Sequence, residues 1–131
     1  DPVLSVALAP DGALAAAGTQ QGRIRFVRPG ARDELPGRAE AHPGGATAVA
    51  FDRTGALLAT GGRDRAVKLW AVTADGAEPL FTVAHLPAAV QELHFDPKGD
   101  RLLVLLAHEH AARVWDVAAL RAELKALNLD W

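Results

Sequence analysis

Cysteine and methionine are both absent from the 131 residues. Without cysteine the chain can form no disulfide, no thiolate metal site and no cysteine nucleophile, although the redox compartment stays open. The chain also lacks the roughly 18 consecutive apolar residues that a membrane helix needs, and its N-terminus lacks the regions of a secretory signal. We therefore expect no membrane partner, and we leave the location open with the cytoplasm favoured.

The chain also lacks a large excess of charge of one sign. Lysine and arginine total 14 against 16 acidic residues, which gives a formal net charge of -2. A protein that binds nucleic acid or an anionic membrane usually carries a basic surface, so we expect neither partner. Half of the residues are hydrophobic, as in a soluble domain with one modest core, and a chain without methionine that opens in a strand-like pattern suggests a piece of a longer protein.

An internal repeat organises the whole chain. The turns "APDGAL", "DRTGAL" and "DPKGDR" place Gly12, Gly55 and Gly99 at steps of 43 and 44 residues. Alternating apolar segments flank each turn, and glycine there supplies the positive φ that a tight hairpin needs. The pattern therefore predicts a pair of antiparallel strands around every turn.

Further strands follow each hairpin. "RIRFV", "VKLWAV" and "ARVWDV" predict a third strand in each repeat, and 78–83 predicts a fourth in the middle repeat, with a weaker one at 31–36 in the first. About four antiparallel strands every 40 to 45 residues is the blade of a β-propeller. We expect an all-β protein of about three four-stranded blades in an incomplete ring.

The blade boundaries follow from this period. We place the blades at about 3–41, 46–84 and 89–117. The tail beyond them predicts a short C-terminal helix at about 118–128, because Leu120, Leu124 and Leu127 would share one helical face.

Residues 41–72, "AHPGGATAVAFDRTGALLATGGRDRAVKLWAV", resemble the WD40 repeat nearly position for position. Ala41-His42 stands at the family's Gly-His, and Leu69-Trp70-Ala71 stands at its closing Leu-Trp-Asp. The outer repeats resemble it less closely, although the third keeps Trp115-Asp116. The tail is similar to that of some bacterial WD40 proteins of several domains, so we expect the C-terminal repeats of such a protein.

The resemblance implies a buried hydrogen-bonded network in the middle blade, formed by His42, Thr60, Asp64 and Trp70. An indole only donates, an ionised carboxylate only accepts, and a hydroxyl and an imidazole can relay between them. The same residues could be read as nucleophile, base and orienting acid of a catalytic site. We favour a structural role because the family repeats this set in blade after blade, and we expect no catalytic residue.

The outer blades depart from this pattern. The third offers a partial network of His85, Glu109 and Trp115, with no hydroxyl on its second strand. The first has Ala17 and Gln21 at the places of the Thr and the Asp. We therefore expect the outer blades to depend on apolar packing.

An incomplete ring leaves two faces bare. We expect exposed apolar patches at 3–8 and 102–106, which monomers rarely tolerate. Either further blades of a longer parent chain or self-association of identical chains would cover them.

The resemblance also implies a partner surface on the top rim. The position before the network Asp points from this rim in the family, and here it is occupied by Gln20, Arg63 and His108, with Arg65 nearby. Arginine is favoured at interaction hot spots. We expect a non-catalytic scaffold that binds a protein or peptide through this rim.

The alternative is a ligand, metal or catalytic site at the central channel. Only the stretch His108-Glu109-His110 points toward it, with His85 as the one plausible further ligand. Our prediction is that the chain holds no metal and no cofactor. Partner identity and blade number lie beyond the sequence.

Overall fold

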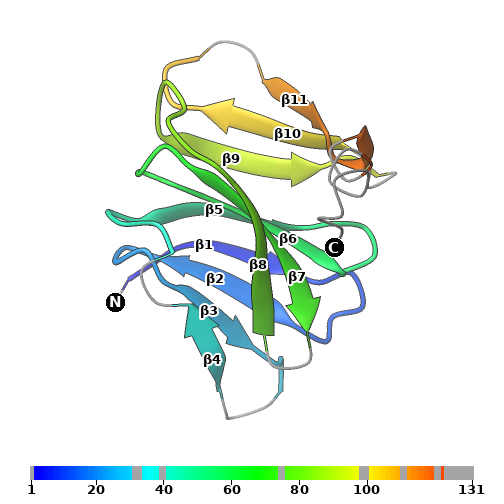
Figure 1. Cartoon of the computed structure of the whole chain (residues 1–131). Helices are drawn as coiled ribbons and strands as arrows, with labels where there is room; N and C mark the ends of the chain where they lie inside the picture. Colours follow the sequence, from blue (N-terminus) through cyan, green and yellow to red (C-terminus); the bar gives the residue numbers. More distant parts are fainter. Residues whose placement is uncertain are drawn as a thin grey trace.

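The computed structural model describes residues 2–30, 34–38, 41–73, 76–97, 101–109, 112–119 and 122. In this part of the chain, strands form three antiparallel sheets that are stacked side by side (Figure 1). The predicted all-β fold is thereby confirmed, with the sheets arranged as blades of an incomplete propeller.

The first two sheets have four strands each, in the order of the sequence. The first consists of β1 (Val3–Leu8), β2 (Ala15–Thr19), β3 (Ile24–Val27) and β4 (Glu34–Arg38). The second consists of β5 (Ala46–Phe51), β6 (Leu57–Gly62), β7 (Val67–Thr73) and β8 (Gly76–Val83). Strand β4 overlaps the predicted segment 31–36 at residues 34–36, and residues 31–33 lie outside the described residues.

The third sheet has three strands in the part of the chain that the structure describes. They are β9 (Val90–Phe95), β10 (Arg101–Leu106) and β11 (Arg113–Asp116). After β11 the chain becomes helical at residues 117–119 and 122. The start of a helix directly after β11 agrees with the helix predicted for the tail. The other residues of the predicted helix, with Leu120, Leu124 and Leu127, lie outside the described residues.

The repeated turns join the first two strands of each sheet. Gly12 and Gly55 both adopt positive φ, at 73° and 77°, as the hairpin requires. In the middle turn the buried carboxylate of Asp52 accepts bonds from the Thr54 hydroxyl and the Leu57 amide. The third turn glycine, Gly99, lies outside the described residues.

The first strands of the three sheets lie next to one another, β1 against β5 and β5 against β9. Small residues permit this close approach. A Cβ at Gly18 would lie 2.5 Å from the carbonyl oxygen of Ala46, and a Cβ at Gly61 would lie 2.5 Å from a methyl of Val90. These two glycines occupy equivalent positions at the two junctions.

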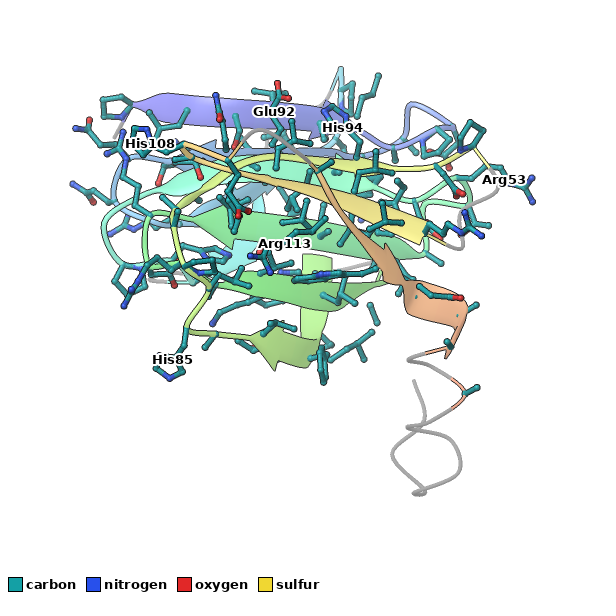
Figure 2. All side chains as sticks on the ribbon, turned by 90° about the horizontal axis from the view of Figure 1, so that it is seen from above. Arg53, His85, Glu92, His94, His108 and Arg113 are labelled. Atoms are coloured by element: carbon teal, nitrogen blue, oxygen red, sulfur yellow. The ribbon has the colours of Figure 1, made fainter. Side chains whose placement is uncertain are left out.

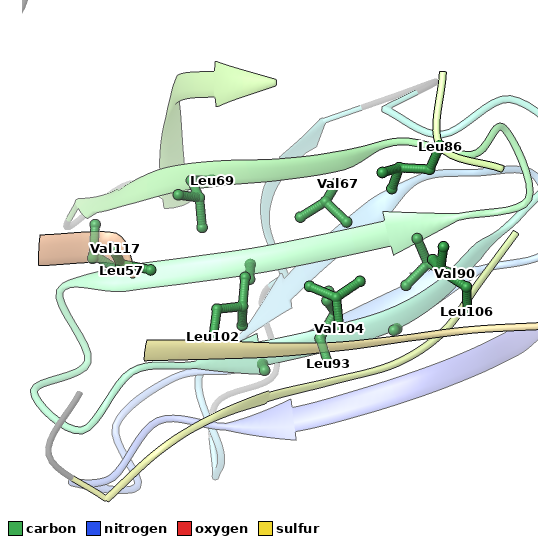
Figure 3. Close-up of a cluster of buried hydrophobic side chains, with 13 residues drawn as sticks. Leu57, Val67, Leu69, Leu86, Val90, Leu93, Leu102, Val104, Leu106 and Val117 are labelled. Atoms are coloured by element: carbon green, nitrogen blue, oxygen red, sulfur yellow. The ribbon is translucent and has the colours of Figure 1, made fainter. Parts of the chain in front are cut away.

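Two hydrophobic cores fill the junctions between sheets. One contains Ile24 and Phe26 of the first sheet with Val49, Leu58 and Trp70 of the second. The other packs one face of the second sheet against the third and is shown in Figure 3. Its larger members are Leu57, Val67, Leu69, Leu86, Val90, Leu93, Leu102, Val104, Leu106 and Val117. Apolar packing between neighbouring sheets therefore stabilises the arrangement of the three sheets.

Hydroxyl groups add a second link across each junction. Ser5 on β1 donates to the carbonyl of Ala46 on β5 at 3.2 Å. Thr47 on β5 donates in the same way to the carbonyl of Val90 on β9. Neither residue was predicted from the sequence, although both carry a hydroxyl near the start of the first strand of a repeat.

The two outer faces of the stack differ. On β1, Val6 is 68% exposed and Leu8 58% exposed, as the sequence predicted for 3–8. The prediction for 102–106 is wrong in part, because Leu102, Val104 and Leu106 are buried against the middle sheet. Within the described residues, no helix has both the length and the apolar character needed to cross a membrane.

Candidate functional site

A buried hydrogen-bonded chain connects four side chains of the middle sheet. The indole Nε1–H of Trp70 donates to Thr60 Oγ1 at 2.9 Å. Thr60 Oγ1 lies 2.7 Å from His42 Nε2, and His42 Nδ1 lies 3.0 Å from Asp64 Oδ1. The structure thus brings together the four residues that the WD40 resemblance pointed to.

The chemistry of these groups fixes the direction of each bond. Asp64 as a carboxylate can only accept, so the proton of a neutral His42 sits on Nδ1 and points to Asp64. Nε2 of His42 then accepts the hydroxyl proton of Thr60, whose oxygen accepts the indole N–H. Every donor has one acceptor when His42 is neutral, which makes the network complete in that state.

Burial favours this neutral state. Desolvation of the fully buried imidazole lowers the pKa of His42 below its ordinary value, and the nearby Lys68 lowers it further. The hydrogen bond and the negative charge of Asp64 oppose this shift but do not outweigh it. At neutral pH the network therefore contains one charge, on Asp64, whose side chain is 19% exposed.

The network also joins the middle sheet to the first. The amide of His42 donates to the carbonyl of Gly22 in the turn between β2 and β3, at 3.0 Å. A Cβ at Gly22 would lie 1.9 Å from the carbonyl oxygen of His42, so only glycine fits at this contact. His42 therefore fixes the loop between the sheets as well as the inside of its own sheet.

The environment of Thr60 differs from that of a catalytic nucleophile. The Thr60 hydroxyl is fully buried and is already bonded to both Trp70 and His42. A nucleophile must reach its substrate, and this hydroxyl has neither access nor a free proton.

The first sheet lacks the network. Ala17 pairs with Val6 on β1 just as Thr60 pairs with Val49 on β5, so Ala17 stands at the place of Thr60. Val27, in turn, stands at the place of Trp70. Apolar groups replace the hydroxyl and the indole, as the sequence indicated.

In the third sheet a leucine takes the place of the histidine. Leu86 donates its amide to the carbonyl of Arg65, as His42 does to that of Gly22, and Leu86 is buried. His85 is exposed, and Figure 2 shows its side chain pointing away from the sheets. The structure therefore separates His85 from the core instead of placing it in a partial network.

Glu109 is also engaged elsewhere. Its carboxylate accepts from the Arg113 guanidinium, with Oε1 3.0 Å from Nε. Trp115 is half-buried and lines a groove of about 520 Å³ together with Phe81, Val83 and Leu86. The three residues predicted for a partial network thus lie in three different environments.

The predicted rim residues gather at one end of the strands. Gln20, Arg63, Arg65 and His108 are all exposed and lie in the turns between the second and third strands of the three sheets. The guanidinium of Arg63 donates to the carbonyl of Gly44 at 3.3 Å. In Figure 2, His85 and His108 lie toward this end and Arg53 toward the other.

The residues expected for a site at the central channel are described only in part. His110 lies outside them, and no group of three His, Asp or Glu side chains among them could hold a metal. A cleft of about 320 Å³ runs along β1, β5 and β9, with Glu92 and His94 on its wall. Both side chains are exposed and lie 3.7 Å apart.

Comparison with known proteins places one repeat in a family. Residues 35–71 match the family described as WD domain, G-beta repeat. Human Protein Atg16l2 is 30% identical over 110 residues, which cover 81% of this chain and 18% of that protein. Eukaryotic translation initiation factor 3 subunit I of Lodderomyces elongisporus is 34% identical over 88 residues, which cover 64% and 24% respectively.

A third relative is Centriole proteome protein 16 of Chlamydomonas reinhardtii, 34% identical over 125 residues, or 90% of this chain and 5% of that protein. The chain thus spans less than a quarter of the length of these relatives. All three are eukaryotic, so they do not support the predicted bacterial origin. Residues 35–71, which run from β4 of the first sheet to β7 of the second, are a WD40 repeat.

Proposed function

We propose that this chain is a non-catalytic scaffold whose rim binds a protein or peptide partner. The rim consists of the turns that contain Gln20, Arg63, Arg65 and His108. One observation carries the proposal: the buried network ends at Asp64, directly between Arg63 and Arg65. The fold thereby fixes the turn from below and leaves both arginines exposed above it.

The comparisons support this proposal at the level of the family. WD40 repeats generally mediate protein–protein interactions. One of the relatives is by name a subunit of an initiation factor, and another is by name part of the centriole proteome. Since a fold can host many functions, the site residues have to be tested directly.

The network of His42, Thr60, Asp64 and Trp70 has a structural role in this proposal. It stabilises the middle sheet and positions the rim, and it contacts no partner. A buried network of this kind is costly to leave half satisfied, which is the basis of the stability predictions below.

The exposed face of β1 requires a further partner. Val6 and Leu8 occupy the positions that Val49 and Phe51 of β5 use to pack against the first sheet. We propose that another blade covers this face, supplied either by a longer parent chain or by a second copy. A C-terminal position of the repeats and a bacterial origin remain predictions.

Affinity capture with a charge-reversed rim tests the proposal. Arg63→Glu combined with Arg65→Glu should remove proteins that the unmodified chain captures from its native lysate. Arg53→Glu is the matched control, because Arg53 is exposed at the opposite end of the strands. A set of captured proteins that the rim variant retains in full would contradict the assignment.

A further inference from the structure

Three arginines lie in two turns of the rim, Arg23 between β2 and β3 and Arg63 and Arg65 between β6 and β7. Arg23, Arg63 and Arg65 are exposed, and no carboxylate among the described residues pairs with any of them. Their turns are connected through the backbone, because the amide of His42 donates to the carbonyl of Gly22 and the amide of Arg63 donates to the carbonyl of Gly45. The Arg65 carbonyl then accepts from Leu86 of the next loop.

The described acidic groups of this rim are both occupied. Asp64 accepts from the Nδ1–H of His42, and Glu109 accepts from Arg113. The charges of Glu109 and Arg113 balance each other, and the single charge of Asp64 offsets only part of the positive charge of the three arginines. These described groups therefore keep a net positive charge, although the whole chain has a net charge of -2. A ligand of opposite charge would find its counter-charges here.

Backbone strain marks the same surface. Among the described residues, three that are not glycine have positive φ, namely Arg65 at 61°, His85 at 61° and His108 at 65°. Arg65 and His108 lie in the rim turns and His85 in the β8–β9 loop at the same end, whereas the positive-φ turns of the opposite end use Gly12, Gly30 and Gly55. The turn equivalent to that of Arg65 in the first sheet has Gly22 at 87°. A side chain that is kept in a conformation favouring glycine points to a function for that side chain.

We propose that this rim binds an extended peptide rich in Asp and Glu, with Arg23, Arg63 and Arg65 as the charge contacts. The inference rests on the proposed function of the rim and adds the chemical class of the partner. Guanidinium groups pair with carboxylates through two parallel hydrogen bonds, and His85 and His108 offer further polar contacts at the edges. A protein partner is favoured over nucleic acid because the rest of the chain carries no basic excess.

A direct binding experiment with the 131-residue chain tests this. The probe is a fluorescent 12-residue peptide of alternating Glu and Ser, compared with its Gln counterpart by anisotropy. We expect the Glu peptide to bind at least tenfold more tightly than the Gln peptide, and to weaken as salt rises. Equal binding of the two peptides, or no binding of either, would overturn the proposal. Tighter binding of a 12-nucleotide single strand would overturn it in favour of nucleic acid.

Variants then locate the site. Arg23→Gln with Arg63→Gln and Arg65→Gln should lower the affinity for the Glu peptide at least tenfold, whereas Arg53→Gln should change it less than twofold. Arg65→Gly removes the side chain at a position of positive φ that glycine adopts without strain, so we expect it to keep the fold even where the triple variant does not. We expect Arg65→Gly to lower affinity at least threefold; unchanged affinity would overturn the role of Arg65.

The two proposals can fail separately. If the Glu peptide does not bind but Arg63→Glu with Arg65→Glu still removes captured proteins, the rim is a partner site and the acidic class is wrong. If the peptide binds independently of all three arginines, the assignment of this rim as its site is wrong.

Discussion

The middle and third sheets fill the same positions with opposite chemistry. In the middle sheet His42, Thr60 and Trp70 form a buried polar chain. In the third sheet Leu86, Val104 and Trp115 stand at those places, the first two buried and the third half exposed beside a groove. Hydrogen bonds therefore hold the β6–β7 turn of the middle sheet in place. In the third sheet, apolar contacts hold the face that packs on the middle sheet, and no such hydrogen bonds from these positions reach its turn in the described residues.

The outward face of the third sheet also differs from the equivalent face of the middle sheet. Ala48, Ala50 and Gly61 face the third sheet from the middle one. The equivalent positions in the third sheet carry Glu92, His94 and Leu105. Small residues at these positions let the middle sheet approach the third closely. The larger side chains of the third sheet would keep a further sheet at a greater distance.

The largest difference between the sheets should come from their tryptophans. Trp70→Ala removes a buried indole and leaves the Thr60 oxygen without its donor, so we expect a loss of about 3–5 kcal/mol in the free energy of unfolding. Trp115→Ala should cost less than half as much, because Trp115 is only half-buried. Urea unfolding followed by circular dichroism measures both. Equal losses would contradict the contrast.

A second pair of changes tests the close approach of the sheets. Gly61→Ala places a Cβ against Val90, with 2.5 Å to its nearest methyl, and should destabilise by about 1–3 kcal/mol. Leu105→Ala changes the equivalent position on the third sheet, where no sheet follows in the described chain, and should cost less than about 1 kcal/mol. Thermal unfolding of the two variants gives the comparison. A tolerated Gly61→Ala would show that the junction is looser than described.

Exchange of a hydroxyl between the sheets should destabilise both. Thr60→Val leaves the indole of Trp70 and Nε2 of His42 without partners, at a cost of about 1–3 kcal/mol. Val104→Thr buries a hydroxyl among apolar groups in the third sheet and should also destabilise, by about 1–3 kcal/mol. Chemical denaturation of both variants is the measurement, and stabilisation by either change would refute the assigned environments.

The smallest effect should be a pH dependence confined to the middle sheet. The pKa of His42 is lowered in the folded state, so the unfolded state takes up a proton first as the pH falls below about 6.5. Stability from His42 is fully present above that pH and declines below it, with a slope of at most about 1.4 kcal/mol per pH unit.

The control for this pH effect is His42→Leu, which gives the middle sheet the residue type of the third. The variant should be less stable at pH 7. Between pH 6.5 and 5 its free energy of unfolding should lack the decline that protonation of His42 causes in the unmodified chain. A slope that is identical in both proteins would mean that another group titrates.

The sequence was sufficient for the features that local spacing determines. The turn glycines gave the period, since Gly12 and Gly55 have to be at positive φ, and the resemblance pointed to the four residues that the structure joins into one network. Local spacing did not predict that Leu86, and not His85, takes the place of His42 in the third loop. In the middle loop Gly44 and Gly45 follow His42 and take the positive φ values, whereas in the third loop His85 itself takes it and turns outward.

The position of Glu109 shows a second limit of spacing. Val104 pairs with Arg113, nine residues later in the chain, whereas the equivalent Thr60 pairs with Lys68, eight residues later, so the connection in the third sheet is one residue longer. Counting back from Trp115 therefore places Glu109 at the position of Asp64, while counting forward from β10 places His108 there. Only the ion pair with Arg113 decides where the carboxylate goes.

Hydrogen exchange of the tryptophan indoles tests the central contrast most directly. In a nitrogen-proton NMR spectrum, with the signals assigned from Trp70→Phe and Trp115→Phe, the Nε1–H of Trp70 should exchange far more slowly than that of Trp115. The buried bond from Trp70 to Thr60 predicts this protection. Equal and rapid exchange of both indoles would show that the network in the middle sheet is open, and would contradict the account.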